Sequence, residues 1–215
     1  MTSLHDAATA AVREYHPSSA GQQQLRTQFL THLRRHDDGV WKTGPPTHLT
    51  TSTFVYSADL DSALLVLHGK AKLWLQPGGH LEPDDLDLPA AALREATEET
   101  GIADLRLLPG VVQLDRHALA DAFGRCREHL DVRYAAIAPP GATPVDSPES
   151  EAVGWWRLDA LPAVTDPQLP LALREVARQL RDRSQAGNPS ASSEPAASTS
   201  DSSIRSALPN STPSR

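Results

Sequence analysis

Residues 78–102 read GGHLEPDDLDLPAAALREATEETGI, a glycine turn followed by the signals of a helix. Residues 90–99 are rich in alanine, leucine, arginine and glutamate, which have high helix propensity. Asp87 suits an N-cap and Pro89 suits a first helical turn. Gly101 suits the left-handed conformation that commonly follows a helix. The stretch therefore predicts a tight turn and then a helix over 90–99.

Three glutamates of this helix, Glu95, Glu98 and Glu99, are spaced i, i+3 and i+4, so they share one face. Like charges at this spacing repel, and only Arg94 is within reach to offset them. A solvated acidic face is one explanation of such a pattern. The other is a hard divalent cation held by carboxylate oxygens, Mg²⁺ or its substitute Mn²⁺. The opposite face, which we expect to pack inward, carries Leu93, Ala96, Thr97 and Thr100.

The spacing resembles the signature of the Nudix hydrolase family: Gly, five residues, Glu, seven residues, Arg-Glu, an apolar residue, any residue, Glu-Glu, any residue, Gly, an apolar residue. Residues 94–102 match its second half without a gap. The first half of the signature is matched less well by this chain. Counted from Gly79, the glutamate position holds Asp85, and eight residues instead of seven separate it from Arg94. Asp84 could fill the position equally well, so the sequence leaves the choice open.

A second match to the family lies outside this stretch. Residues 155–162 read WWRLDALP, similar to the strand ending in an aromatic residue and the Leu-Asp-x-Leu-Pro turn of Nudix proteins. The resemblance, over about residues 48–182, implies an α/β fold: an α/β/α sandwich with a mixed sheet and the Nudix box as a loop-helix-loop. Strand-like segments and a closing helix over 167–183 agree with it. The expected strands include 50–56, 63–68, 129–138 and 152–157.

Composition divides the chain into three parts. Residues 1–44 predict two helices, over 4–15 and 19–36, which we expect to pack on the sheet or on a partner subunit of a homodimer. We expect residues 45–183 to form the Nudix domain that the resemblance implies. Residues 184–215 are rich in serine, alanine and proline, so they cannot bury enough apolar surface to offset ordering, and we expect a disordered tail.

The resemblance implies an enzyme that cleaves the pyrophosphate of a nucleoside diphosphate linked to another group, using a metal-activated water. It implies Glu95, Glu98, Glu99 and the Gly79 carbonyl as metal ligands. It further implies Glu95, Glu98 and Arg94 as the catalytic residues, with Glu95 a ligand or the base and Arg94 orienting the glutamates.

Other residues are weaker candidates, because loop acids are often merely solvated and tryptophans often fill the core. The additional acids are Asp84, Asp85, Glu128 and Glu151. His129 and Asp131 share one face of a strand, as a structural pair or as a substrate contact. The candidates for phosphate or base binding are His68, Lys70, His80 and Trp74.

Charge and composition exclude several functions. The net charge of −7 argues against binding duplex nucleic acid. No apolar run is long enough to span a membrane, and no signal peptide is evident. The single cysteine, Cys126, excludes an internal disulfide and fits the reducing cytoplasm. The substrate that the family resemblance implies is a small nucleotide or another diphosphate.

Two alternatives keep the fold and change the function. One resembles the isopentenyl diphosphate isomerases, which the complete Arg-Glu-x-x-Glu-Glu run disfavours. The other is a catalytically silent Nudix domain that binds a nucleotide and regulates a partner. The aspartate and the inserted residue in the first half of the box keep this second alternative open. Oxidised nucleoside triphosphates, ADP-ribose and nucleotide sugars all remain open as substrates.

The composition of the tail generates a first prediction. Ending the chain at Arg183 should leave the melting temperature and turnover nearly unchanged, because a segment whose large apolar residues are only the isolated Ile204 and Leu208 makes few stabilising contacts. Thermal unfolding of both chains measures this. A fall in melting temperature of more than about 5 °C would show that the tail docks on the domain.

Overall fold

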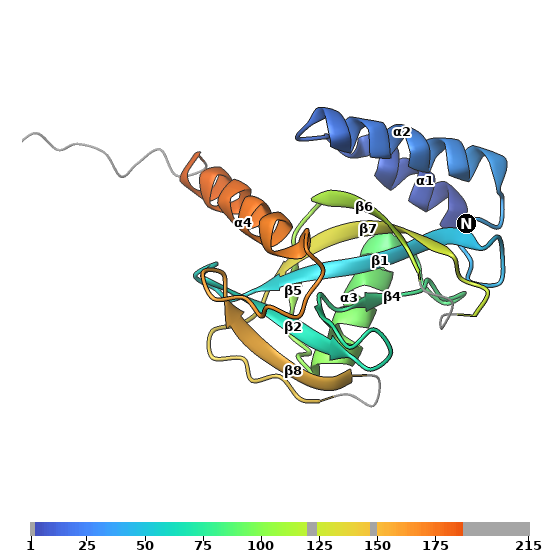
Figure 1. Cartoon of the computed structure of the whole chain (residues 1–215). Coiled ribbons are helices and arrows are strands. Elements are labelled where there is room, and N and C mark those ends of the chain that lie inside the picture. The colour runs from blue at the N-terminus through green and yellow to red at the C-terminus, as the bar shows by residue number, and fades with distance from the viewer. Residues whose placement is uncertain (1–2, 120–123, 147–149, 187–215) are drawn as a thin grey trace, which may run out of the picture.

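A computed structural model describes residues 3–119, 124–146 and 150–186. Its helices lie on both sides of a mixed sheet (Figure 1), which confirms the expected α/β architecture. The helices in these ranges are α1 (Leu4–Glu14), α2 (Ala20–Arg35), α3 (Leu88–Thr100) and α4 (Leu169–Ala186). The strands are β1 (Thr47–Tyr56), β2 (Ser62–His68), β3 (Trp74–Leu75), β4 (Gly78–Gly79), β5 (Arg106–Leu107), β6 (Gln113–Ala118), β7 (Glu128–Ile137) and β8 (Ser150–Arg157).

The centre of the sheet is a parallel pair, β1 and β7, in register from Thr47 opposite Glu128 to Tyr56 opposite Ile137. The outer edge of β7 pairs antiparallel with β6 and β5. Parallel strands are usually buried on both faces, and nine consecutive residues of β1 are buried here.

The edge of β1 that faces away from β7 is paired with β2 only at one end. β1 pairs with β2 only at Val55 and Tyr56, and β2 then continues against β3 and β8. Further back along β1, Thr51 and Ser52 pair with the two glycines of β4. The tight turn predicted at these glycines is instead the strand β4, which lies where β1 and β2 diverge and contacts α3.

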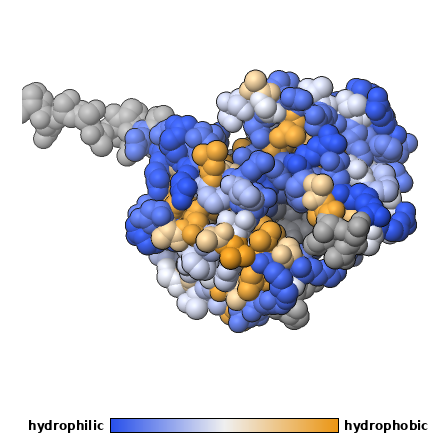
Figure 2. Space-filling model, in the orientation of Figure 1, coloured by the Kyte–Doolittle hydropathy of each residue, from blue (hydrophilic) through white to orange (hydrophobic). Residues whose placement is uncertain are grey.

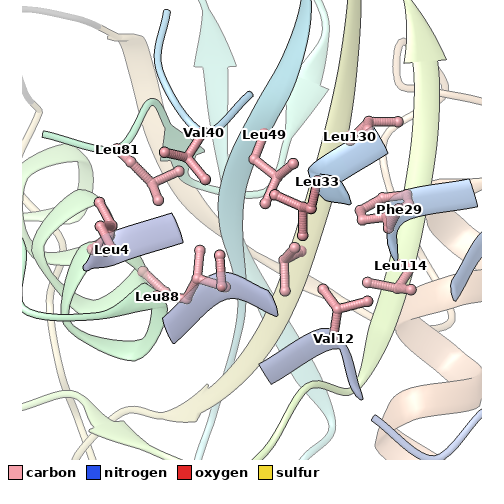
Figure 3. Packing of buried hydrophobic residues seen from close by; sticks show 14 of the residues in the cluster. Leu4, Val12, Phe29, Leu33, Val40, Leu49, Leu81, Leu88, Leu114 and Leu130 are labelled. Carbon is pink, nitrogen blue, oxygen red and sulfur yellow. The ribbon is translucent and has the colours of Figure 1, made fainter. Parts of the chain in front are cut away.

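One hydrophobic core fills the space between the sheet and helices α1, α2 and α3 (Figure 3). Phe29 and Leu33 of α2 pack against Leu49 and Leu130 of the central strands. The two N-terminal helices thus pack on the sheet, one of the two places expected for them. Figure 2 shows mostly hydrophilic and intermediate residues on their outer surface, as expected for amphipathic helices.

The opposite face of the sheet is covered at one end by α4. This helix buries an apolar stripe, and the Tyr56 hydroxyl donates to the Leu173 carbonyl oxygen at 2.8 Å. Trp155 and Trp156 belong to different hydrophobic clusters, so they do lie on opposite faces of β8. The stripe consists of Leu169, Leu173, Val176 and Leu180.

Some boundaries differ from the expectation. The sequence predicts short strands over 105–108 and 111–114; β5 lies within the first, whereas β6 begins at Gln113 and extends beyond the second to Ala118. Asp115, Arg116 and His117 carry no apolar alternation, so pairing with β7 alone makes this segment a strand. Helix α4 extends to Ala186, and the rest of the expected tail, 187–215, lies outside the described residues.

The helices were also predicted to be too short or too polar to span a membrane. Among the described residues, none of the helices combines the length and the apolar character needed to cross a bilayer.

The position of Phe29 generates the second prediction. Its side chain is fully buried between α2 and the sheet. Phe29→Ala should lower the free energy of unfolding by about 3–5 kcal/mol, the range for deleting a buried phenyl group. Urea unfolding measures this. The control Leu171→Ala removes a side chain that is 73% exposed and should change stability by less than about 0.5 kcal/mol. Equal effects of the two substitutions would show that the N-terminal helices are dispensable for the fold.

Candidate active site

Helix α3 begins and ends as its sequence predicts. The Asp87 side chain accepts from the Ala90 N–H at 2.9 Å, and Pro89 lies in the first turn. At the other end Gly101 adopts φ +67°, and its N–H donates to the Thr97 carbonyl oxygen at 2.8 Å. These caps set the length of the helix and therefore the position of its glutamates.

The three glutamates of α3 are not equivalent. Glu95 and Glu99 are only 8% and 7% exposed, whereas the Glu98 side chain is 59% exposed. Glu99 accepts from the Gly78 N–H at 2.9 Å, so its carboxylate lies against β4. The buried stripe of α3 includes Ala91, Ala92, Glu95, Ala96 and Glu99, whereas Leu93 and Thr97, expected on the packing face, are only partly buried.

The glycine pair allows this close approach. A Cβ at Gly79 would lie 2.7 Å from both carboxylate oxygens of Glu95. A Cβ at Gly78 would lie 2.4 Å from the Ser52 Cβ. A side chain at Gly78 would push β4 away from the backbone of β1, and a side chain at Gly79 would displace the Glu95 carboxylate. The glycines therefore bring main-chain groups of β4 against two buried carboxylates.

Arg94 connects the other acidic groups. Its Nε and Nη2 donate to the two oxygens of Asp85, each at 3.0 Å, a bidentate pair. Its Nη1 donates to Glu95 and to Glu98, each at 3.1 Å. A further hydrogen bond from Nη2 reaches the His80 carbonyl oxygen at 3.0 Å. The hydrogen bonds to Asp85, more than the nearby negative charges, raise the pKa of Arg94, so the guanidinium remains charged.

The two aspartates of the irregular first half differ sharply. The Asp85 side chain is 4% exposed and also accepts from the Glu82 N–H at 2.7 Å, whereas Asp84 is exposed. Burial raises the pKa of Asp85, but the hydrogen bonds from Arg94 and Glu82 outweigh it, and the net pKa is lowered. Asp85 is therefore the aspartate that faces the helix, and it binds Arg94.

The additional acids Glu128 and Glu151 have partners of their own. Glu128 accepts from Arg116 at 2.7 Å, and Arg116 also contacts Gln28 of α2. Glu151 forms an ion pair with Lys72. Neither of these contacts involves a carboxylate of α3.

The candidates for substrate binding are dispersed. The His68 ring nitrogen accepts from the main chain of Lys70 and Ala71, while Lys70 itself is exposed. Trp74 packs edge-on against Trp156, with ring centroids 5.1 Å apart. Burial, with smaller effects of Lys42 and His48, lowers the pKa of His80 to about 4, so its imidazole is neutral at pH 7.

A buried polar network beside β4 could be predicted only in part from the sequence. Asp131, 2% exposed, accepts from Ser52 at 2.6 Å, Thr50 at 3.1 Å and Arg133 at 3.0 Å. Ser52 is the strand partner of Gly78, which places the network one strand from the glycine pair. The alternation of polar and apolar residues in β7 identified the face, but the contacts across β1 and β7 come from their parallel register.

Comparisons with known proteins agree on one family. The model of the NUDIX domain matches residues 46–180. A Nudix family hydrolase from Clostridium perfringens has 24% identity and a TM-score of 0.52, covering 62% of this chain and 97% of that one. The Escherichia coli dihydroneopterin triphosphate pyrophosphohydrolase has 19% identity and a TM-score of 0.53, covering 65% and 99%.

An Ap4A hydrolase from C. elegans is similar to the same degree, with 18% identity and a TM-score of 0.52, covering 62% of this chain and 98% of that one. At these identities the likeness concerns the fold. No curated protein sequence matches the chain.

The contrast between the two aspartates generates the third prediction. Asp85→Asn should lower the free energy of unfolding by about 1.5–3 kcal/mol, the range for a charge-assisted hydrogen bond. Asp84→Asn should change it by less than about 0.5 kcal/mol, since the side chain is exposed. Urea unfolding of both variants at neutral pH measures the difference.

The pH dependence of the free energy of unfolding gives a further test of the difference between Asp84 and Asp85. Because the pKa of Asp85 is lowered from 3.8 in the folded protein, its contribution is present above pH 3.8 and is lost as the pH falls through the lower folded value. Asp85→Asn and the parent chain should therefore converge in stability at acidic pH. Similar stabilities of Asp84→Asn and Asp85→Asn at pH 7 would refute the assignment.

Proposed function

Because this chain belongs to the Nudix family of pyrophosphohydrolases, we propose that it cleaves the pyrophosphate bond of a small nucleotide derivative with the help of Mg²⁺, or of Mn²⁺ as a substitute. The observation that carries the proposal is the contact of two buried glutamates, Glu95 and Glu99, with the adjacent glycines Gly79 and Gly78. A merely solvated acidic face would not bury its carboxylates in this way.

The chemistry of the donor groups fits a hard divalent cation. The proposed ligands are oxygens: the carboxylates of Glu95, Glu98 and Glu99 and the Gly79 carbonyl. Arg94 supplies one positive charge to a group that also includes Asp85, so carboxylates outnumber cations. A buried excess of negative charge is costly, and a bound cation offsets it.

Each residue of the cluster has a proposed role in the reaction. When bound, Mg²⁺ would neutralise pyrophosphate oxygens and lower the pKa of a water molecule. Glu98 is the exposed member of the three and is well placed to accept a proton from water and pass it to solvent. Glu95, held against Gly79, is the other candidate base. Arg94 is a positioning residue, since its hydrogen bonds orient Glu95 and Glu98.

The substrate class follows from the family and from charge. The solved structures of similar fold include enzymes named for dihydroneopterin triphosphate and for Ap4A, both of which contain linked phosphates. We therefore propose a small nucleotide or related diphosphate for this chain. The net charge of −7 disfavours duplex nucleic acid, and the single cysteine favours a reducing compartment such as the cytoplasm.

The proposal generates the fourth prediction. Glu98→Gln and Glu99→Gln each remove a charge while preserving shape, and each should lower turnover at least about a hundredfold, about 3 kcal/mol in the barrier. The control Glu175→Gln changes an exposed glutamate of α4 and should leave turnover unchanged. Release of phosphate or pyrophosphate from a panel of nucleotides, with and without Mg²⁺, measures turnover.

Folding is checked by circular dichroism of each variant, so that a loss of activity is not mistaken for a loss of structure. Turnover of both box variants within threefold of the parent chain would exclude these carboxylates from the reaction. A parent chain that binds nucleotides but cleaves none of the panel would instead favour the regulatory alternative.

A further inference from the structure

Four potential metal ligands that are distant in sequence meet on the other side of the glycine turn. His48 comes from β1, His80 follows β4, His129 comes from β7, and Cys126 lies in the connection before β7. One ligand atom from each lies within 4.8 Å of all the others. His48 and His129 are direct partners in the parallel register, so the central strands bring them side by side.

His48 is oriented as metal-binding histidines usually are. Its Nδ1 lies 2.9 Å from the Pro45 carbonyl oxygen. A carbonyl only accepts, so Nδ1 carries the proton and Nε2 keeps its lone pair. Main-chain acceptors commonly fix the tautomer of a metal-binding histidine in this way. The side chain is fully buried, and its Nε2 lies 3.1 Å from Nε2 of His80.

His129 gives evidence for a missing ligand that does not depend on the distances within the cluster. Its Nε2 is buried and has no hydrogen-bond partner among the described residues. The centroid of the His129 ring lies 5.2 Å from the ring centroid of His48, 5.0 Å from that of His80 and 5.4 Å from that of His117. A hydrogen bond from His80 to His48 would satisfy those two rings but would leave His129 unpaired. Buried polar atoms rarely lack a partner, so this nitrogen indicates a missing ligand.

We propose that His48, His80, Cys126 and His129 bind a Zn²⁺ ion, separate from the cation at the glutamates. Three imidazoles and a thiolate suit zinc and exclude Mg²⁺, which prefers oxygen ligands. Tetrahedral zinc with bonds of about 2.0–2.3 Å separates its ligand atoms by about 3.3–3.6 Å. The pair His48–His80 is already near that distance, and the remaining atoms need small side-chain rotations.

The surroundings indicate a structural ion. Cys126 is only 6% exposed, and the next residue, Arg127, donates its N–H to the Pro46 carbonyl oxygen at 2.9 Å. Four protein ligands leave no open position, which is typical of structural zinc. His80 directly follows Gly79, and its carbonyl oxygen accepts from Arg94. The ion would therefore anchor the glycine turn to β1 and β7.

Metal analysis of the untagged protein, purified without added chelator, tests the proposal. With Mg²⁺ in excess to fill the glutamate site, the parent chain should retain about one zinc per chain. Cys126→Ser and His129→Gln should each bind zinc at least about a hundredfold more weakly. The control His16→Gln changes an exposed histidine outside the cluster and should bind zinc like the parent. Glu99→Gln should also retain zinc, which separates this site from the proposed active site.

Cobalt substitution of the parent chain reports the ligands directly. The spectrum should show tetrahedral Co²⁺ with a thiolate charge-transfer band, and Cys126→Ser should lose that band. Zinc should also raise the melting temperature of the parent but not of Cys126→Ser. A parent chain without zinc and without the band would overturn the proposal, with a water molecule then bridging the imidazoles. Unchanged zinc affinity in folded Cys126→Ser and His129→Gln would overturn it as well.

Discussion

The close approach of β4 to α3 is the constraint on which the candidate site depends. It exists because Gly79 has no side chain, so the Glu95 carboxylate occupies the space that a Cβ would take. The same approach lets the Gly78 N–H reach Glu99. The opening between β1 and β2 provides the room for β4, and the limited pairing of those two strands produces the opening. Sheet topology and glycine sterics thus act together.

Hydrogen bonds from the positively charged Arg94 then connect the acidic side chains near the start of α3. Arg94 holds Asp85 with two hydrogen bonds, and it contacts Glu95 and Glu98 with a third donor. The guanidinium therefore ties the loop before α3 to the helix and sets the orientation of two carboxylates. The shorter aspartate still reaches Arg94, so the irregular first half of the box keeps a structural role. This arrangement favours a working variant of the motif over a decayed one.

Two groups of potential metal ligands border the same glycine turn, and they differ in chemistry. The carboxylates of α3 are hard ligands, whereas the imidazoles and the thiol of the second cluster suit a borderline metal such as zinc. Their separation allows each group to select its own ion. The link between them is short, since His80 follows Gly79 and its carbonyl oxygen accepts from Arg94.

The local sequence was enough to predict the helix α3 and its caps, because these depend on residues within a few positions of each other. It did not predict that Gly78 and Gly79 form a strand paired with β1 instead of a tight turn. It was also enough to indicate the fold class and the outer helices, through apolar periodicity and the WWRLDALP segment. Helical spacing correctly grouped Glu95, Glu98 and Glu99 on one side. It did not show that two of them are buried and one exposed, since spacing does not reveal what packs against a helix.

The tertiary structure alone decided which aspartate faces Arg94 and which residues meet around His129. The choice of Asp85 depends on the path of the loop over 80–87, which carries an inserted residue and no periodic pattern. The cluster of His48, His80, Cys126 and His129 depends on the parallel register of β1 and β7, which joins residues 81 positions apart in the chain. Such contacts are set by strand pairing across the core, and no spacing within a short stretch of sequence encodes them.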